Sequence, residues 1–241
     1  MKKLFAFLSF IIITSCQITE TIHLNPDGSG IIDVSSIRDE NSYLQLTGGS
    51  YSNEEIFKDT TYVFNDYIIK YAENFSKLPS TEKAMFNKYK DVRVYTKESS
   101  FEKEYKSTFT QDFNKAEVIA DLYKTAAYAA DLKHNYALSA EEYYYDVSFS
   151  FDGKTFKRIV KITDQEQLKK EQKRIENFKK KNVGSNFLHT LTLQYYFPRK
   201  IKSVSNPKAI ISDDKQSLQL AFQIFDCQLN PETGNLEVVL E

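Results

Sequence analysis

Three histidines, His23, His134 and His189, are the side chains of this sequence best suited to acid–base or metal chemistry. They lie far apart, and none belongs to an H-E-x-x-H or H-x-H pair, so their spacing indicates no metal site. His189 shares a strand face with Leu191, Leu193 and Tyr195, which favours a core or strand-edge residue over a general base. No nucleophile elbow, phosphate loop, dinucleotide fingerprint or C-x-x-C pair occurs. The sequence therefore predicts no catalytic residue, no metal and no cofactor.

The carboxylates give no clearer site. Glu141-Glu142 and Asp213-Asp214 are adjacent pairs, and neighbours on a strand point to opposite faces, whereas paired acids of a hydrolase must converge. Asn25, Asp27, Ser29 and Gly30 match positions 1, 3, 5 and 6 of an EF-hand loop, but Ser36 stands where the bidentate Glu is required. We interpret Asn25–Gly30 as a tight turn.

The first cysteine, Cys16, follows a secretory signal pattern. Lys2 and Lys3 precede an apolar run from Leu4 to Ile13, and Thr14-Ser15 supplies small residues before the cysteine. The run is about half the length that spans a bilayer. A buried N-terminal element is the alternative interpretation.

Ile-Thr-Ser-Cys at residues 13–16 resembles the lipobox of bacterial lipoproteins. The resemblance implies removal of residues 1–15, a diacylglyceryl thioether on Cys16 and stable attachment to the membrane through fatty-acyl chains. Gln17 is not the aspartate of inner-membrane retention, and residues 17–20 lack the acidic cluster of surface export. By those sorting rules, we expect the outer membrane, facing the periplasm.

Charge and thiol content narrow the functions further. Losing Lys2 and Lys3 takes the formal net charge from −1 to −3, and such an acidic chain is not expected to bind nucleic acid. Cys227, the other cysteine, would be the free thiol. It sits in an alternating apolar segment, which favours a small half-buried hydrophobe over a nucleophile.

We expect residues 16–241 to form one α+β domain. Its N-terminal half is predicted to contain both strands and helices. The predicted elements are a hairpin of Thr19–Leu24 and Ile31–Ile37, helices over Phe64–Phe75 and Thr81–Tyr89, strands over Val92–Thr96 and Phe101–Phe113, and a helix from Asn114 to Leu132. The helix at Asn114 is expected to begin with a capping box that includes Glu117.

The C-terminal half is expected to complete an antiparallel sheet with the N-terminal hairpin, with helices packed against it. Its predicted elements are a hairpin over Tyr143–Ile162 with an Asp152-Gly153 turn, a helix capped by Thr163 and Glu166 and ending near Lys181, and strands over Phe187–Phe197, Leu218–Phe225 and Leu236–Leu240. We expect these last strands to form an antiparallel meander without a parallel crossover.

Two segments carry a resemblance to known proteins. E-T-I-H-L-N-P-D-G-S-G (residues 20–30) and F-P-R-K-I-K-S-V-S-N-P-K-A-I-I-S-D-D-K-Q-S-L (residues 197–218), with the lipobox, resemble uncharacterised Bacteroidota lipoproteins and more distantly an LppM-type lipoprotein domain. The resemblance implies no catalytic residue. We expect a non-enzymatic outer-membrane lipoprotein that binds a protein partner or an apolar ligand. The alternative is an envelope hydrolase with an unfamiliar carboxylate or histidine site.

Overall fold

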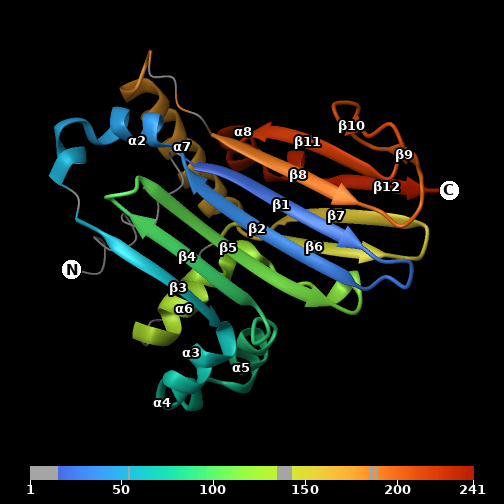
Figure 1. Ribbon diagram of the computed structural model, residues 1–241, viewed down its shortest axis with the longest axis horizontal. Coiled ribbons are helices and arrows are strands. Elements are labelled where there is room, and N and C mark those ends of the chain that lie inside the picture. Colours follow the sequence, from blue (N-terminus) through green and yellow to red (C-terminus); the bar gives the residue numbers. More distant parts are fainter. Residues whose placement is uncertain (1–15, 54, 135–142, 185–186, 188) are drawn as a thin grey trace.

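The computed structural model describes residues 16–53, 55–134, 143–184, 187 and 189–241 and confirms the α+β class. The predicted signal peptide, residues 1–15, and the pair Glu141-Glu142 lie outside these ranges. The strands form two sheets, one of eight strands and one of four (Figure 1). None of the helices in the described ranges combines the length and the apolar composition of a bilayer-spanning helix.

The long sheet has the strand order β10-β11-β8-β1-β2-β5-β4-β3. In that order the strands are Ile210–Ile211, Ser217–Gln223, Thr190–Tyr196, Cys16–Leu24, Gly30–Arg38, Glu104–Phe113, Arg93–Ser99 and Phe57–Val63. Every neighbouring pair is antiparallel except β1 and β8, which run parallel. The expected meander without a parallel neighbour is therefore wrong, because β8 pairs with the first strand of the chain.

The short sheet has the order β6-β7-β12-β9 and is antiparallel. Its strands are Tyr145–Phe151, Thr155–Ile162, Leu236–Leu240 and Ile201–Val204. The predicted Asp152-Gly153 hairpin and the strand Leu236–Leu240 are confirmed, but both lie in this second sheet. The sheet packs on the β1 and β8 part of the long sheet, where Phe156 of β7 meets Tyr195 of β8 edge to face at 5.4 Å between ring centroids.

The N-terminal hairpin is confirmed with an unbroken register from Cys16 opposite Arg38 to Leu24 opposite Gly30. Ile22 and Leu24 are buried, as are Ile32 and Val34 of β2, so alternate residues of both strands face the core. Gly30 is required at the turn because a Cβ there would lie 2.1 Å from the carbonyl oxygen of His23.

The predicted helix over Phe64–Phe75 is broken in two. α3 (Phe64–Lys70) and α4 (Ala72–Ser76) are separated by Tyr71, whose φ of −112° and ψ of 35° leave the helical region. α5 (Ser80–Asn87) is confirmed within a residue or two of its predicted bounds. Phe64, Phe86 and Tyr128 form an aromatic cluster with Tyr89, which fixes these helices beside the β3 to β5 half of the long sheet (Figure 1).

The helix predicted from Asn114 is wrong over its first half. The chain forms short 3₁₀ turns at Ala116–Val118 and Leu122–Lys124, and α6 begins only at Thr125 and ends at His134. Glu117 accepts a hydrogen bond from the backbone N–H of Phe151 instead of capping a helix. The amide oxygen of Gln111 accepts from the N–H of Ala120, so tertiary hydrogen bonds hold this segment in a non-helical path.

Of the remaining helices, α7 follows the prediction closely. α7 (Gln165–Lys181) has its N-cap at Asp164, one residue after the predicted Thr163. Its buried side chains are Leu168 and Ile175. Neither β3 nor α2 (Glu40–Thr47) was predicted, and α8 (Ile224–Leu229) replaces the end of the predicted strand Leu218–Phe225.

Candidate functional site

The three histidines are not brought together. His23 lies on β1 and stacks on Tyr196 of β8 with 4.3 Å between ring centroids, whereas His134 ends α6. His189 precedes β8 and is only 3% exposed. Across the described residues, no three His, Cys, Asp or Glu side chains gather closely enough to hold a metal ion.

His189 was expected to be a core or strand-edge residue with its hydrogen bonds made; it is buried, but those bonds are absent among the described residues. Neither ring nitrogen has a hydrogen-bond partner among the described residues. Burial lowers the pKa of His189 to about 4, although the carboxylate of Asp39 acts in the opposite direction. The ring is therefore neutral at physiological pH.

A small pocket of about 220 Å³ lies against His189. Its lining residues are Phe178, Lys179, Asn182, Phe187, His189, Gln223 and Phe225. The rings of Phe187 and Phe225 lie 5.5 and 4.7 Å from that of His189. A general base in a hydrolase needs a group that orients it, such as a carboxylate hydrogen-bonded to the ring, and His189 has none in the described part of the chain. The hydrolase alternative stays a prediction.

The Asn25–Gly30 segment is a turn closed by its own hydrogen bonds. The N–H of Gly28 donates to the carbonyl oxygen of Asn25 over 3.1 Å, and the hydroxyl of Ser29 donates to Asp27 over 2.6 Å. Hydrogen bonds from Ser29 hold the pKa of Asp27 below its usual value. Asp214 is likewise used in a turn, where it accepts from Ser212 and from the N–H of Gln216.

A buried ion pair between the two sheets is the feature that sequence reasoning missed. Arg158 of β7 donates to both carboxylate oxygens of Glu20 of β1, over 3.0 and 3.1 Å. Glu20 is 0% and Arg158 3% exposed. The hydroxyls of Tyr123 and Tyr195 also donate to Glu20, and Arg158 donates further to the carbonyl oxygen of Gly234.

The electrostatics of this inter-sheet cluster (Glu20, Tyr123, Arg158 and Tyr195) favour a fixed charge state. Burial and the neighbouring Glu20 raise the pKa of Tyr195 and of Tyr123 well above the usual value. Burial works to lower the pKa of Arg158, but Glu20 and the tyrosines outweigh it and raise that pKa. Every polar group has a partner, so the cluster joins the sheets and offers no open position to a substrate.

The sequence did contain a sign of this cluster. Glu20 lies between Ile18 and Ile22 on the apolar side of an alternating strand, and Arg158 lies likewise between Phe156 and Val160. A charge on a core-facing position requires a partner, but two strands 138 residues apart give no hint that they are each other's partners.

Asp121 is a half-buried residue whose carboxylate lies beside this cluster. One of its oxygens accepts from the N–H of Val147 over 3.1 Å, and the other has no partner in the described part of the chain. Burial raises the pKa of Asp121 to about 6. Lys124, which opposes that rise, is itself paired with Asp146.

Cys227 lies in α8, not in a strand, and is half-buried against the core. Burial raises the pKa of its thiol to about 11, so the thiol stays protonated at neutral pH and is a weak nucleophile. Cys16 is the first residue of β1, and its predicted acylation stays a prediction.

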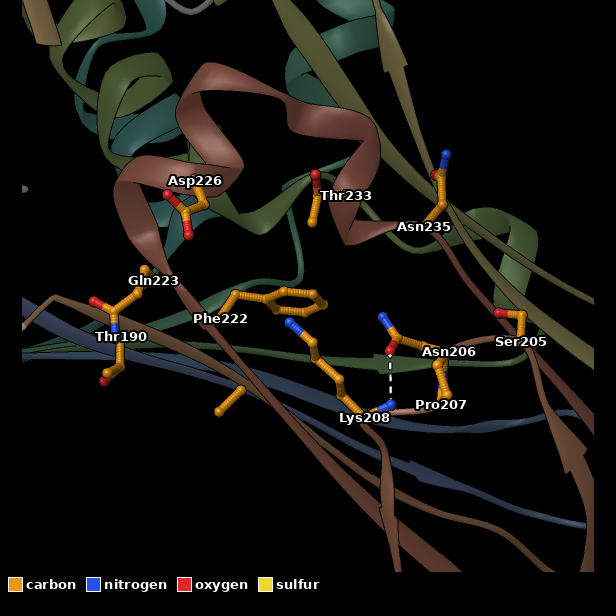
Figure 2. A pocket seen from close by; sticks show the side chains of 11 residues that line it. Thr190, Ser205, Asn206, Pro207, Lys208, Phe222, Gln223, Asp226, Thr233 and Asn235 are labelled. Carbon is orange, nitrogen blue, oxygen red and sulfur yellow. Dashed lines mark hydrogen bonds between the residues drawn. The ribbon is translucent and has the colours of Figure 1, made fainter. Parts of the chain in front are cut away.

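The larger hollow is a groove of about 500 Å³ at the edge of the long sheet (Figure 2). Its lining residues are Thr190, Ser205, Asn206, Pro207, Lys208, Ala221, Phe222, Gln223, Asp226, Thr233 and Asn235. Figure 2 shows Phe222 in the middle of the groove, with Lys208 and Asn206 on one side and Asp226 on another. The side-chain oxygen of Asn206 accepts from the backbone N–H of Lys208 over 3.0 Å and fixes that turn.

This groove runs beside a strand edge that is only partly paired. β11 pairs with β8 along its whole length, but on its other side β10 covers only Leu218 and Gln219. Among the described residues, Leu220–Gln223 have no strand neighbour on that side. No contiguous stretch of the sequence predicts the groove, because its lining comes from five separate segments of the chain.

No family model and no curated protein sequence matches this chain. Among solved structures, the chain is similar to the folded domain of the LppM protein of Mycobacterium tuberculosis, determined by NMR. The two share 8% sequence identity, over 94% of this chain and 90% of that one, with a TM-score of 0.39. The resemblances to Bacteroidota lipoproteins and to LppM-type domains have no matching family model and stay predictions.

Proposed function

We propose that this chain is a non-enzymatic lipoprotein of the outer membrane, anchored through acylated Cys16, and that it binds an extended segment of a partner protein in the groove beside β11. The observation that carries the proposal is the unpaired edge of β11 along a groove of about 500 Å³. An exposed strand edge offers a row of backbone donors and acceptors that an incoming strand can pair with.

The side chains around the edge suit a peptide better than a wholly apolar ligand. Phe222 and Pro207 supply apolar surface, while Lys208 and Asp226 place opposite charges on the rim. Pairing of main chains would supply affinity, and these side chains would select the sequence of the partner. A small apolar ligand, the other expectation, would leave the charges on the rim unused.

Photo-crosslinking in living cells tests the proposal. A benzophenone amino acid at Ala221, in the groove, is compared with the same group at Ile159, which is 41% exposed on β7 of the other sheet. We expect a discrete protein adduct at Ala221 and none at Ile159. Equal adducts at both positions, a lipid adduct at Ala221, or no adduct at all would overturn the peptide proposal.

A blocking variant shows that the adduct reflects docking. Ala221→Arg places a long charged side chain in the groove, and Ile159→Arg is the matched control on the other sheet. Ala221→Arg is expected to reduce binding of the crosslinked partner by about tenfold or more, and Ile159→Arg to leave it unchanged. Far-ultraviolet circular dichroism of both variants checks that the fold is retained.

The anchor is tested separately. Cells are fed an alkyne-labelled fatty acid, and wild type is compared with Cys16→Ala. We expect label on the wild type alone. An unlabelled wild-type protein would overturn the lipoprotein assignment.

A further inference from the structure

Cys16, the proposed anchor, is already part of a strand. β1 starts at Cys16, which pairs with Arg38 of β2, and Gln17 already pairs with both Ile37 and Thr190. No spacer therefore separates the residue proposed to carry the lipid from the centre of the long sheet. A lipid chain buried in a bilayer would hold this end of the sheet at the headgroups.

Several other segments end at the same level. Phe57 pairs with Ser99, Ser99 pairs with Glu104, and Ile37 pairs with Lys106. Figure 1 shows α2, the end of α7 and the connection from β4 to β5 at the same end of the long sheet as the start of β1. We call this surface the Cys16 end; it comprises Cys16–Gln17, Ile37–Leu44, Ile56–Phe57, Ser99–Glu104 and Lys179–Val183.

The Cys16 end carries large apolar side chains in contact with solvent. Val183, Phe101 and Phe57 are 85%, 77% and 68% exposed. Ile37, Leu44 and Ile56 add partly exposed apolar surface. Apolar side chains gathered on one end of a protein indicate a surface that is covered in the cell.

The polar residues around them suit the interface of a bilayer. The guanidinium of Arg38 lies 3.6 Å from the ring centroid of Tyr43 and 3.0 Å from that of Tyr105. The last turn of α7 carries Lys179, Lys180 and Lys181. Tyrosines and basic residues are the side chains that favour the headgroup level. The acidic Glu102 and Glu104 of this end are paired with Lys97.

We propose that the Cys16 end lies directly on the lipid bilayer, with Phe57, Phe101 and Val183 inserted among the headgroups and Lys179–Lys181 facing anionic phosphates. The proposal rests on the acylation of Cys16. It fixes the orientation of the molecule: the long strands stand away from the membrane, and the turns at Asn25–Gly30 and Asp152-Gly153 lie at the membrane-distal end.

Position-specific fluorescence quenching tests this orientation in the full lipidated protein. In a Cys227→Ser background, which leaves no free thiol once Cys16 is acylated, single cysteines are introduced by Phe101→Cys and Val183→Cys. The matched controls are Ile210→Cys and Ile69→Cys, whose parent residues are 71% and 65% exposed in β10 and α3, away from the Cys16 end (Figure 1). Each is labelled with an environment-sensitive fluorophore and placed in vesicles of phosphatidylethanolamine and phosphatidylglycerol.

Lipids carrying a nitroxide at the headgroup are expected to quench the labels at residues 101 and 183 about twofold more than those at 210 and 69, and aqueous iodide is expected to do the reverse. Equal quenching at all four positions by both agents would overturn the proposal. Failure here is distinct from failure of the anchor: a protein that takes the fatty-acid label but shows equal quenching contradicts only the orientation.

Discussion

Glu20 lies on β1, and His189 directly precedes the neighbouring strand β8. Both are polar residues buried on the inner face of the long sheet. Glu20 accepts hydrogen bonds from Arg158, Tyr123 and Tyr195. His189 has no hydrogen-bond partner among the described residues and lies against a pocket. The same sheet thus buries one polar side chain that is fully hydrogen-bonded and another that, among the described residues, makes no hydrogen bond.

The difference shows what burial of a polar side chain can mean. At Glu20 one partner, Arg158, comes from the second sheet, so the ion pair fixes how the two sheets are aligned. At His189 the surrounding rings supply apolar contact only. Burying the imidazole nitrogens without hydrogen bonds therefore lowers the free energy of unfolding. That position lies one residue before Thr190, which pairs with Gln17 at the proposed membrane end.

The largest effect is expected from removing Arg158, the cation that is paired with Glu20. Arg158→Met leaves the carboxylate of Glu20 buried without its cation, and we expect a loss of about 3–5 kcal/mol in the free energy of unfolding. Urea denaturation followed by circular dichroism measures it. A loss below about 1 kcal/mol would show that the inter-sheet cluster is not a structural element.

The control is the double variant Glu20→Met with Arg158→Met. Removing both charges relieves the unpaired carboxylate, so the double variant should be more stable than Arg158→Met alone by about 1 kcal/mol or more. It should not recover fully, because the hydroxyls of Tyr123 and Tyr195 then lose their shared acceptor.

Replacing His189, the residue without a hydrogen-bond partner among the described residues, is expected to have a smaller effect and to raise the free energy of unfolding. The pKa of His189 is about 4 in the folded protein and 6.5 in its reference state. A base with a lowered folded pKa contributes stability above the unfolded pKa and loses it as pH falls from about 6.5 to about 4. His189→Leu removes this loss, and near pH 4.5 the variant should exceed wild type by about 2 kcal/mol.

Denaturation at pH 7.5 and 4.5 measures the His189→Leu effect, with His23→Leu as the control on the adjacent strand. If wild type and His189→Leu lost the same stability between these pH values, His189 would have to gain a partner on protonation. The comparison with Glu20 would then no longer hold.

Asp121 lies between the two extremes, since one of its oxygens is bonded and the other is not. Its folded pKa of about 6 exceeds the usual 3.8, so its contribution to stability is present below about 3.8 and is lost as pH rises to about 6. Asp121→Asn keeps an acceptor for Val147 and removes the charge. Above pH 6 we expect it to be more stable than wild type by about 1–2 kcal/mol, measured by thermal unfolding across that window.

The smallest effect is expected at an exposed ion pair. Lys169 and Glu166 of α7 lie 2.9 Å apart with side chains 67% and 76% exposed. Lys169→Ala should leave the free energy of unfolding close to that of wild type, because solvent screens the pair. An effect comparable with that of Arg158→Met would mean that burial is not what distinguishes the inter-sheet cluster.

Local patterns predicted much of the fold. The hairpin of β1 and β2, the Asp152-Gly153 hairpin, α5 and β12 follow from alternation and turn residues that lie within a few positions of one another. The helix at Asn114 failed for a different reason: Glu117 accepts a hydrogen bond from the N–H of Phe151, outside the predicted helix, and the N–H of Ala120, inside it, donates to the side chain of Gln111. A capping pattern cannot compete with such tertiary hydrogen bonds once they form.

The candidate site was beyond the reach of these patterns. The groove beside β11 depends on how far β10 extends along its neighbour, and β10 is only two residues long. Its lining joins β8 and β11 to α8 and the segments around Ser205 and Thr233. Cys16 is the functional position that could be predicted from the sequence, because a lipobox is a contiguous motif. The residues of the groove could not be predicted in this way.

The α+β class, the main turns and the proposed lipid anchor could be predicted from the sequence, since each depends on the identities of neighbouring residues. The packed fold was needed to show that β1 pairs parallel with β8, that two sheets replace one, and that Glu20 meets Arg158. Those choices are made by side chains more than a hundred positions apart, whose mutual burial is settled only when the whole core packs.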